Sequence, residues 1–252
     1  MAITLGRREF LASAWACGCS FCAPGSSRAQ TQLRARIYCS NAPANPANLV
    51  EMREYAKKKL IELKDSPRLE LIRYIQDEDK RLTEFFGTNS PIYLDSENKD
   101  DAYVNIDQSF IALGEGFLED HANKKMVRVA GLLAHEQSHL FQVRWTIDAL
   151  LKEVRNFPVK FVELHADYLA GAYVGWRKKA NPATPIQALE ELFFELGDRN
   201  VRNRDHHGTP EERKLAFFQG YDDFPRLRGA SGPGPAMVAS HRGLMYVKAI
   251  LL

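Results

Sequence analysis

Residues 126–141 read MVRVAGLLAHEQSHLF, and this stretch organises the interpretation of the whole sequence. Its apolar residues recur at helical spacing, at Met126, Val129, Ala130, Leu133 and Leu140. This spacing predicts an amphipathic helix, and Asn123 can cap its first turn. His135 and His139 lie four residues apart inside that helix, so both imidazoles should project from the same face.

The segment His135-Glu136-Gln137-Ser138-His139 has the spacing of a zinc-binding helix, because two imidazoles four residues apart can bind one zinc ion. Glu136 lies one step around the helix, where it could contact a zinc-bound water but is badly placed to join both histidines as a ligand. Zinc lowers the pKa of such a water, and the carboxylate could accept its proton and pass it on. A chance match occurs in roughly one such chain in a hundred. The alternative is a helix whose histidines and glutamate are solvated or pair locally.

A second helix is predicted to start at Pro158 and to reach about Trp176. Glu163 and Asp167 lie four residues apart on one face of it. Glu163 would be the third metal ligand, completing the two-histidine, one-glutamate set of catalytic zinc sites. Asp167 could accept the free ring N–H of a ligand histidine, which we expect to be His135. The alternative is an exposed acidic stripe, which the apolar neighbours disfavour; these are Phe161, Val162, Leu164, Tyr168 and Leu169.

The composition of the 252-residue chain is that of an ordinary globular protein. Hydrophobic residues make up 45% and charged residues 26%, which excludes collagen-like, disordered and polytopic membrane proteins. The 34 basic and 32 acidic residues give a net charge of +2, which argues against nucleic acid as a partner. The length suits one large domain or two small ones.

Residues 1–29 are predicted to be an export signal that is cleaved near Ala29. Arg7 and Arg8 precede a short apolar stretch, residues 10–22, and the order of these features resembles a twin-arginine signal. Ser27 and Ala29 supply small residues at the cleavage point. We therefore expect a periplasmic or secreted protein. The alternatives are an N-terminal anchor helix and a structured first helix.

Removal of this signal would change the charge and the cysteine content. It would take three of the 34 basic residues and one of the 32 acidic ones, leaving no net charge. Cys39 would be the one cysteine left, so neither an intrachain disulfide nor a thiolate zinc site could form. Any metal site would have to use histidines and carboxylates.

The rest of the sequence predicts a predominantly helical α+β fold. Further helices are expected at 49–63, from Pro67 to about Gly87, and after two capping boxes at 184–187 and 209–212, ending near Gly197 and Gly220. Short strands are expected at 91–94, 102–106 and 110–113. We predict a single domain over residues 30–226, and a low-complexity, flexible tail over 227–252.

The pattern His135-Glu136-x-x-His139 followed by Glu163-x-x-Ala166-Asp167 resembles the gluzincin metallopeptidases. The nearest groups are the HtpX-like and CAAX-processing zinc proteases and the neutral zinc metallopeptidases. The resemblance covers about residues 100–222, through segments similar to those families at 102–105, 111–118, 163–171, 207–213 and 217–221. Ser138 stands where these families usually have glycine, a change that a helix tolerates.

The resemblance implies a zincin-like metallopeptidase domain in which a small sheet precedes the active-site helix. It implies zinc as cofactor and a peptide or protein substrate that adds to the strand lining the cleft. A histidine in the late segment would stabilise the oxyanion; His207 holds that place, and Arg213 would brace the wall of the site. The other interpretation, a solvated loop pair of His206 and His207, stays open. Unlike the integral members, this chain has no apolar run that would span a membrane in its mature form.

The leading hypothesis is therefore a secreted zinc-dependent metalloendopeptidase. His135, His139 and Glu163 would hold the metal, and Glu136 would be the general base. An alternative on the same fold is a catalytically silent, zinc-stabilised binding or chaperone-like protein. A third interpretation is a helical protein without metal.

Overall fold

A computed structural model describes residues 49–52, 67–95, 101–146, 159–179, 182–203, 206–227 and 234–251. Its elements are β1 (Leu49–Glu51), α3 (Pro67–Phe86), β2 (Ile92–Asp95), β3 (Ala102–Asn105), β4 (Phe110–Gly114), α4 (Glu115–Lys124), α5 (Met126–Phe141), the π-helical turn η2 (Gln142–Thr146), α7 (Val159–Lys178), α8 (Ile186–Glu195), α9 (Pro210–Asp223), the 3-10 turn η3 (Phe224–Leu227) and α10 (Pro235–Leu251). This architecture confirms the prediction of a predominantly helical α+β protein.

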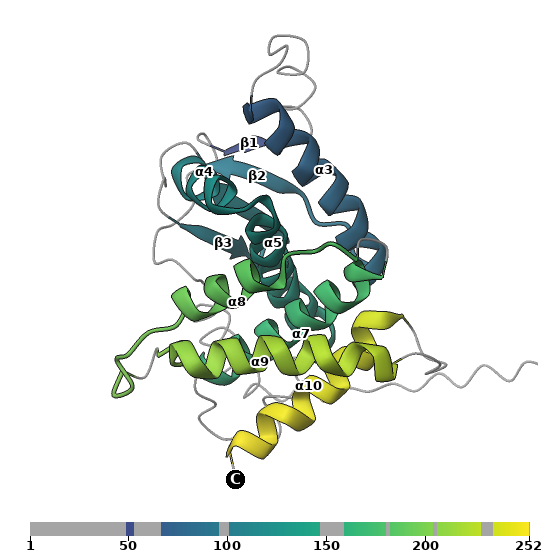
Figure 1. Cartoon of the computed structure of the whole chain (residues 1–252), viewed down its shortest axis with the longest axis vertical. Coiled ribbons are helices and arrows are strands. Elements are labelled where there is room, and N and C mark those ends of the chain that lie inside the picture. The colour runs from purple at the N-terminus through teal and green to yellow at the C-terminus, as the bar shows by residue number, and fades with distance from the viewer. Residues whose placement is uncertain are drawn as a thin grey trace, which may run out of the picture.

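The four short strands form one sheet in the order β1-β2-β4-β3. β2 and β4 run parallel, with Ile92 opposite Ile111, whereas β1 and β3 pair antiparallel at the two edges. β4 is buried along its whole length. The edge strand β3 lies against α5, so the sheet is placed beside the helix that carries the histidine pair (Figure 1).

The helical part is built around α7, which packs against α5, α9 and α10 (Figure 1). α7 and α9 approach closely because each has a glycine at the contact. A Cβ on Gly171 would lie 1.9 Å from the Phe217 carbonyl oxygen, and a Cβ on Gly220 would lie 1.9 Å from the Tyr168 carbonyl oxygen. Neither position can hold a side chain without separating the two helices.

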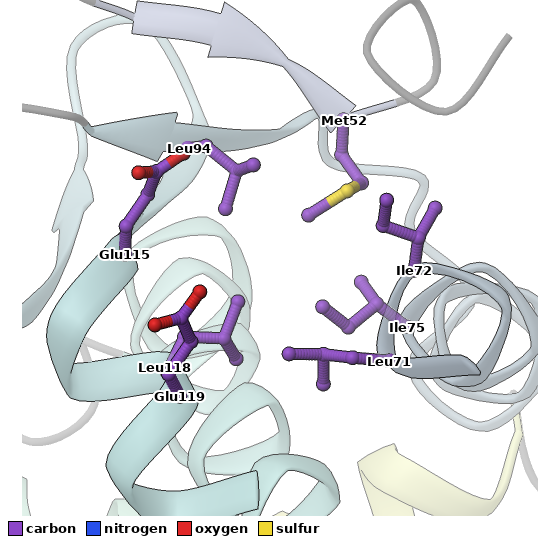
Figure 2. A pocket seen from close by; sticks show the side chains of 8 residues that line it. All are labelled: Met52, Leu71, Ile72, Ile75, Leu94, Glu115, Leu118 and Glu119. Carbon is purple, nitrogen blue, oxygen red and sulfur yellow. The ribbon is translucent and has the colours of Figure 1, made fainter. Parts of the chain in front are cut away.

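The long helix α3 is attached to the sheet by apolar contacts. Leu71, Ile72 and Ile75 of α3 point toward Leu118 of α4 and Leu94 of β2, around a narrow apolar pocket (Figure 2). Met52, Glu115 and Glu119 also line this pocket. α3 is joined to α7 by buried polar groups as well: the Glu78 carboxylate accepts hydrogen bonds from Arg177, at 2.7 Å, and from Tyr173.

The predicted start of the long helix was wrong. Residues 115–124 form the separate helix α4, and α5 begins at Met126 after Lys125, whose backbone is extended at φ −168° and ψ 130°. Asn123 therefore does not cap α5. The buried residues of α4 are Leu118 and His121, which lie three residues apart, as expected on one face of a helix. Residues 111–118 had been compared with a strand and turn, so this helix was not predicted.

The predicted flexible tail was also wrong over most of its length. Residues 235–251 form α10, which packs on α7 (Figure 1). The Gly/Pro-rich run ends at Pro235, which is the first helical residue, a position where proline is favoured. Ala236, Ala239, Ser240 and Val247 are buried beyond it, and their helical spacing gives α10 a packing face.

The two capping boxes behave differently. Thr209 caps α9, because its hydroxyl accepts from the Glu212 backbone N–H while the Glu212 carboxylate accepts from the Thr209 backbone N–H. Thr184 does not cap α8, whose N-cap is Pro185. The Thr184 hydroxyl instead accepts a hydrogen bond from Arg177, at 3.3 Å.

The other predicted helix and strand boundaries agree with the structure except near residue 49. α3 ends before Gly87 as predicted, and β2, β3 and β4 match the three predicted strands within two residues at each end. β1 replaces the start of the helix expected at 49–63, and the rest of that helix lies outside the described residues, as does the expected export signal 1–29. None of the described helices combines the length and apolar character that crossing a bilayer requires.

Replacing Gly171 by alanine is expected to destabilise the protein by about 1–3 kcal/mol, because the new methyl group collides with the backbone of α9. Urea unfolding of the variant would measure the loss. Leu215→Ala, at an exposed position of α9, is the control and should change the free energy of unfolding by less than about 0.5 kcal/mol. Equal stability of the Gly171→Ala variant and the unaltered protein would contradict the close α7–α9 contact.

Candidate metal centre

α5 and α7 bring together the three residues that sequence spacing singled out as metal ligands. His135 and His139 of α5 face Glu163 of α7, and one ligand atom from each lies within 4.8 Å of the others. All three side chains are buried, with 3%, 0% and 1% of their surface exposed. Residues from two separate helices therefore form one enclosed cluster.

The distances within this cluster fit a tetrahedral ion. The two Nε2 atoms are 3.1 Å apart. His135 Nε2 lies 3.3 Å from Glu163 Oε2, and His139 Nε2 lies 3.5 Å from Glu163 Oε1. Two ligands at about 2.0–2.1 Å from zinc at the tetrahedral angle are about 3.3 Å apart. The three separations scatter around that value.

Hydrogen bonds fix the tautomer of each ligand histidine. His135 Nδ1 lies 2.9 Å from the Asp167 carboxylate, to which it donates. His139 Nδ1 lies 2.9 Å from Gln142 Oε1. The amide atom that faces His139 is the oxygen, because the amide nitrogen of Gln142 donates to the Val162 carbonyl oxygen, at 2.8 Å, and a carbonyl can only accept. Both histidines therefore carry a proton on Nδ1 and direct Nε2 into the cluster.

The centre of the cluster gathers acceptor atoms. Both carboxylate oxygens of Glu163 are buried, and their polar neighbours lie at 3.3–3.5 Å: His135 Nε2, His139 Nε2 and Arg213 Nη2. They meet two imidazole nitrogens whose lone pairs point to the same place. Buried acceptors of this kind are costly unless a cation lies among them. Either a proton or a metal ion can supply that charge, and the donor set of two imidazoles and one carboxylate suits zinc.

Without metal, the central proton belongs to His135. Burial would lower the pKa of His135, but hydrogen bonds to Asp167 and Glu163 raise it to about 9. Burial lowers the pKa of His139 to about 4. Burial would raise the pKa of Glu163, but the neighbouring His139, His135 and Arg213 hold it well below its usual range. At neutral pH Glu163 is ionised, and the proton on His135 occupies the position that a metal would take.

Asp167 connects the cluster to α9. Its two carboxylate oxygens accept hydrogen bonds from Nε and Nη2 of Arg213, both at 2.8 Å. Nη1 of Arg213 also donates to the Leu196 carbonyl oxygen, at 3.1 Å. Arg213 of α9 thus lies beside the cluster, in contact with Asp167 and Glu163. With neutral histidines, Asp167, Glu163 and Arg213 leave one net negative charge facing a bound cation.

Glu136 is a second buried carboxyl next to the ligand histidine His135. Burial, with smaller contributions from Glu163 and Asp101, raises the pKa of Glu136 to about 7, against an opposing effect of His135. Its Oε2 atom has no hydrogen-bond partner. A carboxyl with a pKa near neutrality can both accept and return a proton. The pKa of Glu136 on α5 is thus raised, whereas that of Glu163 on α7 is lowered.

The two histidines of the α8–α9 loop are bound to Asp198 rather than to the ligand cluster. His206 is buried, with Nδ1 2.6 Å from Asp198 Oδ1 and with no partner for Nε2. His207 donates its backbone N–H to Asp198 Oδ2, at 2.9 Å, and its ring is one-third exposed. His207 is the histidine that the sequence resemblance implies, but the ring with a fixed orientation is that of His206.

Gln142 is the site residue that the sequence analysis missed. It follows His139 by three residues, and residues three apart on a helix are neighbours. That spacing was available in the sequence, but nothing there showed which acceptor His139 would use. The π-helical turn η2, which begins at Gln142, is a type of turn frequent at functional sites.

The chain matches no protein-family model, and searches of curated proteins and of solved structures found no similar protein. The resemblance to gluzincins therefore rests on the residues themselves.

Metal binding is expected to release about one proton at pH 8, because the ion takes the Nε2 atom that His135 protonates below a pKa of about 9. The apparent affinity should rise about tenfold per pH unit as the pH rises toward 9, and level off above it. Calorimetric titration with zinc in buffers of different ionisation enthalpy measures the proton count. Binding without proton release at pH 8 would contradict this assignment.

Proposed function

We propose that this protein is a zinc-dependent metalloendopeptidase that uses Glu136 as its general base. The observation that carries the proposal is the convergence of two imidazole Nε2 atoms and the buried Glu163 carboxylate at tetrahedral spacing. Two histidines and one glutamate form the ligand set of catalytic zinc sites, which keep a fourth position for water or substrate.

Zinc held by His135, His139 and Glu163 would polarise the scissile carbonyl and activate the attacking water. Glu136 would accept the proton of that water on Oε2, the oxygen that has no partner in the protein. It would then return the proton to the leaving amine nitrogen. Asp167 and Gln142 would keep the two ligand histidines in the required tautomer throughout.

The position of β3 supports a peptide or protein as substrate. β3 is an antiparallel edge strand and lies against α5. An extended peptide can add to such an edge through main-chain hydrogen bonds, and this would bring a peptide bond next to the metal helix. The sheet beside the metal helix is also the arrangement that a zincin-like domain would have.

A histidine of the α8–α9 loop would stabilise the oxyanion in this proposal. His207 has the place in the sequence that the gluzincin resemblance implies, and its ring is partly exposed. His206 has the better-defined ring, because Asp198 holds its Nδ1 and leaves Nε2 as a free second nitrogen. The two histidines can be separated by mutation.

A second candidate is a zinc-stabilised binding or chaperone-like protein that cleaves nothing. In a structural zinc site, no coordination position is left open for water or substrate. His135, Glu136, His139 and Glu163 each expose 3% or less of their surface, so the cluster is enclosed, as such a site would be. It would bind zinc and a protein partner, and neither property would depend on Glu136.

Export is part of the proposal. Residues 1–29 would direct the chain to the periplasm or the outside of the cell and would be removed near Ala29. N-terminal sequencing of the protein recovered from a periplasmic or medium fraction would identify the new N-terminus.

Glu136→Gln is expected to lower kcat for peptide cleavage by about 10²–10⁴-fold while zinc is still bound at one per chain. The amide has nearly the same shape but cannot accept the proton. Hydrolysis of a mixed peptide library, followed by mass spectrometry, measures the effect. Glu84→Gln, on an exposed position of α3, is the matched control and should keep full activity. Normal turnover by Glu136→Gln would refute the general base, and zinc binding without turnover in the unaltered protein would favour the second candidate.

Replacing the oxyanion histidine is expected to lower kcat by about 10²–10³-fold with little change in zinc content. Separate His206→Ala and His207→Ala variants would show which residue takes this role. A loss confined to His207→Ala would support the assignment from the sequence resemblance. A loss confined to His206→Ala would assign the role to the histidine that Asp198 orients, and full activity in both would exclude this loop from the chemistry.

A further inference from the structure

A chain of hydrogen bonds runs from the metal ligand His139 to the C-terminal helix α10. The Gln142 amide accepts from His139 Nδ1, at 2.9 Å, and its nitrogen lies 2.9 Å from His165 Nδ1. His165 Nε2 lies 3.1 Å from the backbone carbonyl oxygen of Ser240, on α10. Gln142, His139, His165 and Ser240 are all completely buried, so water does not compete for these bonds.

The direction of every bond in this chain is determined by two backbone carbonyls. Val162 O and Ser240 O can only accept, so the Gln142 amide nitrogen donates to the first and His165 Nε2–H donates to the second. His165 Nδ1 is then unprotonated and accepts the second amide proton of Gln142. Both protons of the amide are used, and its oxygen must face His139.

α10 reaches His165 because Gly243 has no side chain. A Cβ at Gly243 would lie 2.8 Å from His165 Cδ2 and 2.8 Å from Tyr168 Cδ1. The Ser240 hydroxyl, one turn earlier, lies 3.3 Å from His165 Nε2. The ring of Tyr246 adds a contact with Tyr168, at 5.8 Å between centroids. α10 thus packs closely on α7 at His165, the residue that continues the chain to the metal site.

We propose that α10 controls the metal affinity of the site, with His165 and Gln142 as positioning residues. If α10 leaves His165, the ring loses the acceptor of its Nε2 proton and can take the other tautomer, with the proton on Nδ1. That Nδ1–H then faces the NH2 group of Gln142, donor against donor, which displaces the amide although Val162 O still accepts one of its protons. Gln142 Oε1 would then no longer hold the Nδ1–H of His139, and the ring of this ligand would lose the orientation that directs Nε2 to the metal.

This inference rests on the metal site of the proposed function but not on peptide cleavage. Loss of an orienting partner of a ligand histidine typically lowers metal affinity 10–100-fold. The expected effect therefore appears as an affinity change and as a change in ligand geometry. Cobalt(II) in place of zinc reports that geometry in its visible absorption spectrum.

The test measures the zinc affinity of the full-length mature chain by competition with a chromophoric chelator, together with the cobalt(II) spectrum. Gly243→Ala, which forces α10 away from His165, and His165→Leu should each bind zinc at least tenfold more weakly and alter the cobalt spectrum. His165→Gln keeps one acceptor and one donor, so it should recover part of the affinity. Met245→Ala, at a 60% exposed position of α10, should bind zinc like the unaltered protein.

A glycine elsewhere on α7 separates positioning from general destabilisation. A Cβ at Gly175 would lie 2.9 Å from the Tyr221 carbonyl oxygen and from Phe224 Cβ, away from His165. Gly175→Ala should lower the melting temperature but leave the zinc affinity within a factor of about two. Thermal unfolding of the metal-free variants shows that each still folds.

Three outcomes would overturn the inference. Unchanged zinc affinity in Gly243→Ala and His165→Leu would remove the role of α10. An equal loss in Gly175→Ala would show that any weakening of the helix packing suffices. Absence of zinc binding by the unaltered protein would refute both this inference and the proposed function. If the protein binds zinc, shows the affinity changes expected for Gly243→Ala and His165→Leu, and yet cleaves no peptide, only the proposal of peptidase activity is refuted.

Discussion

The convergence of four acceptor atoms in one buried cluster is the constraint on which the arrangement of the helices depends. These atoms are the Nε2 atoms of His135 and His139 and the two carboxylate oxygens of Glu163. Burying an ionised carboxylate costs several kcal/mol unless a counter-charge is close. Two positive charges can offset this cost. One is at the centre of the cluster, either a proton on His135 or a bound metal ion, and the other is the Arg213 guanidinium, 3.4 Å from Glu163. α5, α7 and α9 must lie close together for these groups to meet.

The close contact of α7 and α9 places Arg213 at the site. Gly171 and Gly220 remove the side chains that would separate these helices, and the Thr209–Glu212 capping box fixes where α9 begins. Arg213 then follows in the first turn of α9, where its guanidinium reaches both oxygens of Asp167. Asp167 in turn orients His135, so the glycine contact between the two helices helps to hold the carboxylate that orients a candidate metal ligand.

The two glutamates of the site differ in a way that suits different tasks. Cationic neighbours lower the pKa of Glu163, whereas burial raises that of Glu136 to about 7. The first is an anion ready to bind a metal, and the second can exchange a proton near neutral pH. Carboxyls whose environments push their pKa values apart are typical of acid–base chemistry. This difference in pKa supports the proposal of a peptidase, whereas the burial of the cluster supports a zinc-stabilised binding protein.

Local spacing in the sequence determined which side chains share a face. The helix period places His135 with His139 and Glu163 with Asp167. Alternating apolar residues bounded by turn residues located β2, β3 and β4, because these patterns depend on neighbours along the chain.

Tertiary structure alone decided which faces meet. Thr184 and Thr209 carry the same capping motif, yet Arg177 of another helix takes the hydroxyl of Thr184. α10 follows a low-complexity run, and only its packing on α7 shows that it is a folded helix. Gln142 and His165 acquire their roles from Val162 O and Ser240 O, and Ser240 lies 75 residues from its partner, so no local pattern could reveal that contact.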